Sequence, residues 1–193
     1  MKTLLATIFS LALALFFVLA LPSAGEETVY ADTLRLHVLA ASDETADQNA
    51  KLLVRDAVLA TYGDAFLSTK SKGEAEDYLV THLDAIEETV KKTLDENRLN
   101  YTVAVTLTDE WFDTRTYGEI TLPEGRYTAL KITLGEGKGQ NFWCMLYPAL
   151  CVTPAHGNKV TADAAYTDAA YTLVKNGYAL RFRTLELLSS LIG

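Results

Sequence analysis

The two cysteines of the chain, Cys144 and Cys151, lie seven positions apart in a segment that also holds glycines and adjacent aromatics. Three states are open to them: a structural disulfide, two buried free thiols, or one reactive thiol. A disulfide requires Cα atoms within about 7 Å, so the intervening chain must bend back, and Pro148 is well placed to begin that bend. A reactive Cys144 would instead need a base, such as His37 or His156, within hydrogen-bond reach.

The glycine run that precedes the cysteines, Gly135, Gly137 and Gly139, invites comparison with loops whose backbone amides hold phosphate. It has neither the G-x-G-x-x-G spacing nor the Gly-Lys-Ser/Thr ending of a P-loop. The run is therefore predicted to be a flexible surface turn at which the chain leaves a sheet. The three histidines fall in no clustered ligand spacing, so neither a metal nor a cofactor is expected.

Carboxylates offer the remaining route to catalysis. A secreted hydrolase acting on cell-wall polymer or peptide would need one buried acid and one ionised partner. Most acidic residues fall on predicted helix faces and turns. Asp109 and Glu110, directly before Trp111 and Phe112, form the one place where burial of a carboxylate beside aromatics is expected. The hydrolase is kept as the alternative function, and the chain is predicted not to be an enzyme.

The N-terminus has the form of an export signal. Lys2 precedes an apolar run over residues 4–21, which is followed by proline and small residues. The run is long for a signal peptide and just long enough for a membrane anchor, so both remain open, with cleavage after Ala24 or Ala31 if it is a signal. The body of the chain is then expected outside the cytoplasm, where a disulfide between Cys144 and Cys151 is favoured.

The chain is acidic, with a formal net charge of −8 over 193 residues. Nucleic-acid affinity depends on neutralising phosphates with lysine and arginine, so nucleic acid is not an expected partner. Attachment to anionic lipid by a polybasic patch is excluded for the same reason. The length suits one globular domain.

Two amphipathic helices are predicted after a first strand at residues 33–40. The first helix begins at a capping box of Thr45 and Gln48 and ends before Gly63. The second begins at a capping box of Ser71 and Glu74. Its apolar positions keep helical spacing at Leu79, Leu83, Ile86, Val90 and Leu94.

From residue 101 the apolar period changes from that of a helix to that of a strand. Strands at residues 101–108, 114–122 and 126–134, joined by short turns, suggest an antiparallel meander. The predicted fold class is α+β, with an antiparallel sheet of about four strands, two amphipathic helices on one face, and a preceding export signal. Three regions follow: residues 1–31 as signal peptide or anchor with a short linker, 32–151 as the α+β domain, and 152–193 as a C-terminal extension packing on it.

Four pieces of sequence, in order behind the export segment, carry a family resemblance. They are residues 34–43, the pair Asp47 and Gln48, residues 51–58, and residues 135–151. Together they resemble the stage II sporulation protein R family. The resemblance implies a protein exported from the forespore into the intermembrane space. There it would activate the membrane-bound sporulation sigma-factor processing peptidase of the mother cell, which cleaves the pro-form of the early mother-cell sigma factor.

Under this resemblance, a set of charged and aromatic residues becomes a candidate surface for the peptidase. The charged members are most simply a salt-linked surface, and adjacent aromatics in a small domain commonly place one ring in the core. Aromatic side chains also dominate the energy of protein interfaces. The candidate partner-facing residues are Arg35, Asp43, Arg55, Asp56, Phe142 and Trp143. No small-molecule substrate is expected, and the oligomeric state is left open.

Overall fold

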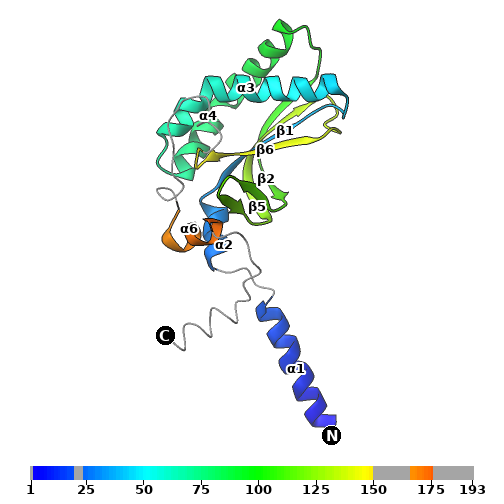
Figure 1. Ribbon diagram of the computed structural model, residues 1–193, viewed down its shortest axis with the longest axis vertical. Helices are drawn as coiled ribbons and strands as arrows, with labels where there is room; N and C mark the ends of the chain where they lie inside the picture. The colour runs from blue at the N-terminus through cyan, green and yellow to red at the C-terminus, as the bar shows by residue number, and fades with distance from the viewer. Residues whose placement is uncertain (1, 20–23, 150–165, 176–193) are drawn as a thin grey trace.

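The computed structural model describes residues 2–19, 24–149 and 166–175 (Figure 1). Most of the predicted C-terminal extension therefore lies outside the described residues. The elements are α1 (Lys2–Leu19), α2 (Ala24–Ala31), β1 (Leu34–Leu39), α3 (Thr45–Ser68), α4 (Lys72–Glu96), β2 (Val103–Phe112), β3 (Arg115–Tyr117), β4 (Ile120–Leu122), β5 (Gly125–Leu134), β6 (Asn141–Tyr147) and α6 (Asp168–Lys175).

The central sheet has four strands in the order β2-β5-β1-β6. β1 runs parallel to β5 and antiparallel to β6, and β2 is antiparallel to β5. The α+β class and the four strands are confirmed, but the prediction of an antiparallel sheet is wrong, because the sheet is mixed. Alternation of apolar residues reports which side chains share a face and not the direction of a strand. The chain passes from β1 to β5 through α3, α4, β2 and the β3–β4 segment, a connection long enough for parallel pairing.

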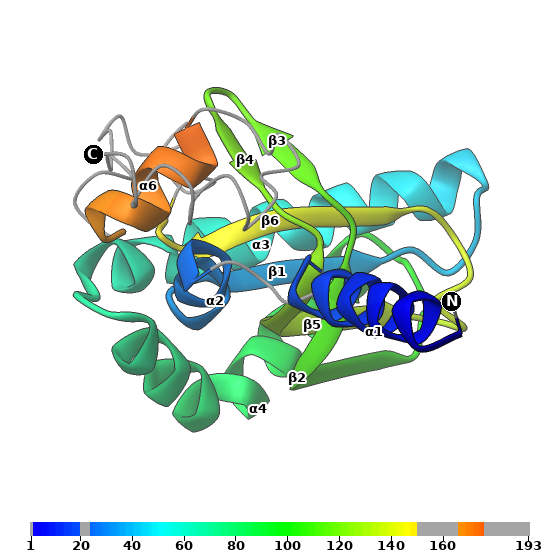
Figure 2. The ribbon, with the colours of Figure 1, turned by 90° about the horizontal axis from the view of Figure 1, so that it is seen from below.

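The predicted middle strand of the meander, residues 114–122, is not part of this sheet. It forms a separate two-stranded hairpin of β3 and β4, which projects from the sheet in Figure 2. The hairpin turns at Gly118, whose φ of 61° glycine adopts without strain. β2 therefore pairs directly with β5 over the full length of both strands. The fourth strand of the sheet is β6, which carries Phe142 and Trp143.

Helices α3 and α4 cover one face of the sheet, called here the helix face. Alternate residues of β1 point toward it, and their side chains are completely buried. They join a core with apolar residues of both helices: Leu34, Leu36 and Val38 from β1, Val54 and Val58 from α3, and Leu79 and Ile86 from α4. The prediction of two amphipathic helices on one face is thus confirmed.

The helix termini follow the sequence pattern in one case and depart from it in the other. In α4 the Ser71 side chain accepts a hydrogen bond from the Glu74 amide, as predicted. In α3 the residue before the helix is Glu44, which makes no side-chain cap, and the Ser42 hydroxyl accepts from the Glu44 amide instead. The same helix continues past Gly63 because burial of Phe66 offsets the cost of a glycine inside a helix.

The other face of the sheet, called here the opposite face, is covered by shorter elements. Helices α2 and α6 lie side by side and contact β5 and β4 respectively (Figures 1 and 2). A second apolar core forms there between the sheet, the hairpin and the two helices. Its buried residues are Val29, Phe112, Ile120, Leu122, Tyr127, Ala129, Met145, Tyr166, Ala170 and Val174.

Helix α1 carries the apolar run of the predicted export segment. The side chains of residues 2–15 are all exposed. Among the described helices, none combines the length and the apolarity that crossing a bilayer requires. The export signal therefore stays a prediction.

Candidate functional site

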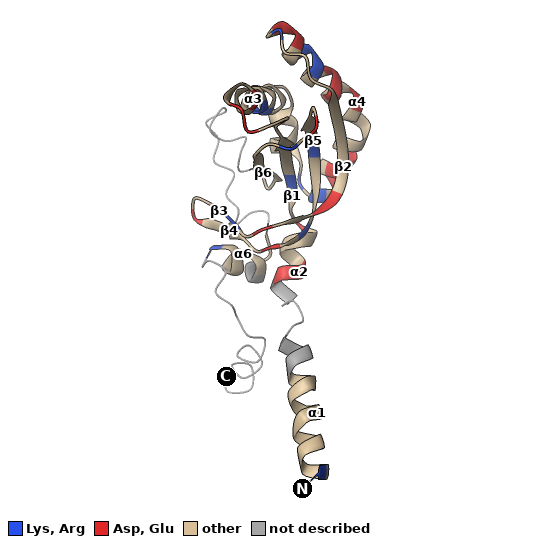
Figure 3. Ribbon diagram, turned by 90° about the vertical axis from the view of Figure 1, so that its right-hand side faces the viewer, with Lys and Arg blue, Asp and Glu red and all other residues tan. Residues whose placement is uncertain are grey.

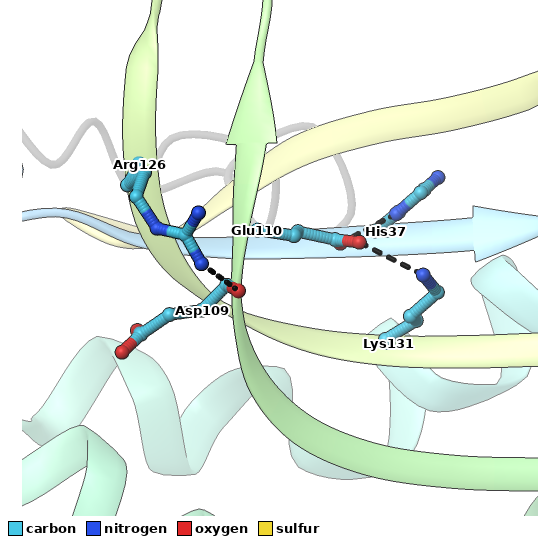
Figure 4. Close-up of polar contacts among 5 residues, drawn as sticks. All are labelled: His37, Asp109, Glu110, Arg126 and Lys131. Atoms are coloured by element: carbon cyan, nitrogen blue, oxygen red, sulfur yellow. Dashed lines mark hydrogen bonds and ion pairs between the residues drawn. The ribbon is translucent and has the colours of Figure 1, made fainter.

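Glu110 of β2 joins His37 of β1 to Lys131 of β5 on the opposite face (Figure 4). Its Oε1 lies 2.5 Å from His37 Nδ1, and its Oε2 accepts a 2.9 Å hydrogen bond from Lys131 Nζ. The fold brings them together because His37 stands beside Lys131 in the parallel β1–β5 register. The Glu110 side chain is only 17% exposed. Glu110 is thus the half-buried carboxylate of the pair and lies beside the His37 ring, while Asp109 is exposed.

The contacts of Glu110 decide its protonation state. Burial raises the pKa of Glu110, but hydrogen bonds and charge from His37 and Lys131 outweigh burial and hold the pKa below its ordinary value of 4.5. Glu110 is therefore an ionised carboxylate at neutral pH, with both oxygens already bound. A general acid in a glycosidase needs the reverse, a carboxyl group whose pKa is raised. The electrostatics of Glu110 do not suit that role.

We expect Glu110→Gln to destabilise the fold at pH 7 by roughly 1–3 kcal/mol, the range for a hydrogen-bonded charged group that loses its charge. Because the fold lowers the pKa of Glu110, its contribution is present above the unfolded-state pKa and is lost as pH falls through the folded-state pKa. Urea unfolding between pH 7 and pH 3 should show the variant and the parent converging below pH 4.5.

The matched control is Glu136→Gln, because Glu136 pairs with Lys138 at a site where both side chains are more than 70% exposed. Such surface pairs contribute little, so this variant should unfold like the parent at every pH. A Glu110→Gln protein with the stability of the control at pH 7 would contradict the role assigned to the carboxylate.

Arg35 lies two residues before His37 on β1, and its side chain is completely buried. Its Cζ stands 4.2 Å from the centroid of the Phe112 ring, and its Nη2 donates a 2.5 Å hydrogen bond to the Tyr117 hydroxyl. Burial lowers the pKa of Arg35, while the neighbouring tyrosines act in the other direction. The guanidinium of Arg35 is therefore not part of the exposed surface, which corrects the expectation of a surface residue.

A second arginine, Arg115 on β3, stacks on Trp143 with its Cζ 3.8 Å from a ring centroid. The Trp143 ring also lies 5.7 Å from His37 and 6.2 Å from Phe112, measured between ring centroids. We call Arg35, His37, Phe112, Arg115 and Trp143 the cation–aromatic cluster. Figure 3 marks the lysine and arginine positions of β1 and β5 in blue.

The glycine run folds against the start of α3, at the end of β1. The Gln140 amide donates to Asp43 Oδ1 at 2.7 Å, and Lys51 Nζ donates to the Gln140 carbonyl at 3.0 Å and to Gln48 Oε1 at 2.6 Å. Lys51 is only 6% exposed, and burial lowers its pKa. We call this contact between residues 40–51 and 135–140 the loop junction. Sequence runs almost a hundred residues apart therefore meet at one place.

The other predicted partner-facing residues lie beside α3. Arg55 places its Cζ 4.7 Å from the centroid of Phe142, and its Nε donates to Asp56 Oδ1 at 2.7 Å. Phe142 packs on the helix face and Trp143 on the opposite face, because neighbouring residues of a strand point to opposite sides. The six predicted residues thus do not form one patch. That any of them contacts a partner stays a prediction.

The position of Cys144 in the sheet bears on the alternative in which it is a reactive thiol with a histidine base. Cys144 is buried on the helix face beside Leu36 and is disulfide-bonded. Its predicted partner, Cys151, lies outside the described residues, so the pairing stays a prediction. His37 is on the opposite face, so the sheet separates it from Cys144, and His156 also lies outside the described residues. Within the described residues, no cluster of three or more histidine, cysteine or acidic side chains could hold a metal.

The sequence analysis did not identify three residues of this region: Lys131, Arg115 and Tyr117. Arg35 and His37 share a face because they lie two residues apart on β1. Finding Lys131 needed the parallel register of β1 and β5, and finding Arg115 and Tyr117 needed the hairpin, which was predicted as a single strand.

The described residues define a class of protein: an α+β domain whose mixed sheet carries two helices on one face and a charged, aromatic cluster on the other. The stage II sporulation protein R family model matches residues 30–156. The chain belongs to this family.

One relative is the stage II sporulation protein R of Bacillus subtilis (strain 168), 36% identical over 118 residues. The match covers 61% of this chain and 53% of that protein, so the chain spans about half the length of its relative. No solved structure matches the chain significantly.

Proposed function

We propose that this protein is a non-enzymatic signal, exported from the forespore, that activates the membrane-bound processing peptidase of the mother cell. It would bind the exposed part of the peptidase and shift it toward an active state, which triggers cleavage of the pro-form of the early mother-cell sigma factor. A binding partner can do this only if it favours the active conformation.

Family membership is the observation that carries this proposal, because it makes the chain a sporulation protein. The apolar N-terminal run supports export. The geometry also gives little support to the hydrolase. Glu110 is held ionised by its hydrogen bonds to His37 and Lys131, and Cys144 and His37 lie on opposite faces of the sheet. A disulfide at Cys144 is consistent with a location outside the cytoplasm.

The test is to produce the full chain in cells that also carry the processing peptidase and its pro-sigma substrate, and to measure substrate cleavage. We expect cleavage to depend on the chain. A version lacking residues 2–19, which would remain in the cytoplasm, should give none. Equal cleavage with both versions would contradict an exported signal, and no cleavage with either would return the hydrolase to first place.

The surface beside α3 offers a sharper test of the partner-facing prediction. Asp56 has a side chain 64% exposed and pairs only across the surface with Arg55, so Asp56→Lys reverses a charge without disturbing the core. We expect at least a fivefold loss of cleavage if this surface meets the peptidase. Glu88→Lys makes the same change at an exposed site on α4 and is the matched control. Equal activity of the two variants would remove this surface from the proposal.

A further inference from the structure

Arg35 carries a charge that the described structure leaves uncompensated. Its side chain is 0% exposed, and two of its three guanidinium nitrogens, Nε and Nη1, have no hydrogen-bond partner. The third bonds to the neutral hydroxyl of Tyr117. No carboxylate of the described residues forms an ion pair with it. Burial of an unpaired charge is costly, and proteins normally offset it with an anion.

Two further nitrogens of the cation–aromatic cluster are in the same state. Arg115 Nε and His37 Nε2 are both buried without a hydrogen-bond partner. Both residues contact Trp143, and the charges of Arg35 and Arg115 both act on the pKa of the Tyr117 hydroxyl. Arg35 and Arg115, from β1 and β3, therefore bring unused donors to one small region, and His37 adds a ring nitrogen without a partner.

The charge balance of the cluster favours an anion. Glu110, the acidic residue that bonds to His37 of the cluster, already uses both oxygens on His37 and Lys131. Among the described residues, no carboxylate pairs with Arg35 or Arg115, although the net charge of the chain is −8. A guanidinium presents its donors as a planar fork that fits the two oxygens of a carboxylate.

We propose that the cation–aromatic cluster is a binding site for a carboxylate, in which Arg35 and Arg115 supply the charge and the hydrogen-bond donors. Arg35 forms the buried floor of the site. Arg115 is half-buried on the β3–β4 hairpin and forms its outer side. The carboxylate comes either from a small free acid or from an acidic side chain of a protein segment. Because Trp143 stacks on Arg115, its fluorescence should change when the carboxylate binds.

The experiment uses the full chain with the substitution Trp111→Phe. The chain has two tryptophans, so Trp143 is then the only one left. Trp143 emission and the unfolding temperature are followed during titration with sodium acetate at constant ionic strength, with sodium chloride as the balancing salt. A second titration uses N-acetyl-glutamate amide, which presents a side-chain carboxylate in a peptide setting. We expect a saturable change in emission and a rise in unfolding temperature with both probes.

Arg115→Gln should weaken both responses at least tenfold. Arg126→Gln removes the same charge from an exposed arginine on β5, whose Nη2 donates to the Asp109 carbonyl, and should leave them unchanged. Arg115→Lys keeps the charge but not the fork, and should fall between the two. These variants avoid Arg35, whose removal from the core would confuse binding with folding.

Tighter binding of the glutamate derivative than of acetate identifies a protein side chain as the occupant, and equal binding identifies a free small acid. A response that is not saturable, or that Arg115→Gln and Arg126→Gln lose equally, reflects general screening and overturns the proposal.

Discussion

Gly139→Ala should lower the free energy of unfolding by about 3 kcal/mol, the upper part of the range for forced overpacking. A Cβ atom at this position would lie 2.1 Å from the carbonyl oxygen of Ser42, much closer than non-bonded atoms approach. Ser42 has little freedom to move, because Gln48 donates a 2.8 Å hydrogen bond to that same oxygen. The Gly139 amide also donates to the Ala40 carbonyl at 3.0 Å. Urea unfolding of the purified variant measures the effect.

The matched control is Gly73→Ala. Gly73 lies in the first turn of α4, and an added Cβ would approach only the Ser71 hydroxyl, at 3.9 Å. Alanine in a helix is favoured over glycine, so this variant should be as stable as the parent or slightly more stable. If Gly139→Ala and Gly73→Ala have the same free energy of unfolding, the loop junction can rearrange at little cost and does not require the close approach at Gly139.

The loop junction brings together all four pieces of sequence that carry the family resemblance. The first three supply Ser42, Asp43, Gln48 and Lys51, and the fourth supplies the loop that these residues contact. From the sequence alone, the glycines indicated a turn correctly. Gly135 and Gly137 do have positive φ angles, whereas Gly139 is required by contact with a distant backbone. That contact depends on the tertiary fold, so no local pattern could have revealed it.

The sequence predicted elements better than it predicted their pairing. Both amphipathic helices and the alternating strands were recognisable because each buries one face, which sets a period in the sequence. Strand direction leaves no such period, so the parallel pairing of β1 and β5 was missed. The hairpin was missed because its strands have only three residues each, too few for alternation to show.

For the candidate site too, the sequence indicated individual residues but not how they are arranged. Arg35 and Trp143 were singled out by residue type, and the structure places both in the cation–aromatic cluster. Burial of Arg35 was not predicted, because an arginine in a strand is normally at the surface. The buried position is supported by the rings of Phe112 and Tyr127, from two other strands, and by the hydrogen bond to Tyr117.

The second large effect concerns helix α2, which follows the predicted export segment. Val29 is completely buried in the core of the opposite face, and its carbonyl accepts a 2.6 Å hydrogen bond from the Thr33 hydroxyl. The Tyr30 ring packs edge-on against Tyr127 at 5.1 Å between centroids, and its hydroxyl donates to the Glu124 carbonyl. Residues 29 and 30 thus pack against the rest of the domain.

We expect the chain that begins at residue 32 to have a free energy of unfolding about 2–4 kcal/mol lower than that of the chain that begins at residue 25. This is the value for losing one or two buried apolar side chains. Urea unfolding of the two purified forms measures the difference.

Gly125→Ala provides an internal check, because its Cβ would come within 2.6 Å of the Tyr30 ring. It should destabilise the longer form and have little effect on the shorter one, a coupling that only direct contact produces. If the fold needs α2, a cleaved export signal is expected to be cut after Ala24, since a cut after Ala31 would remove Val29 and Tyr30 from the core. An uncleaved anchor would also keep α2. Equal stability of the two forms would remove this constraint and leave both cleavage sites compatible with the fold.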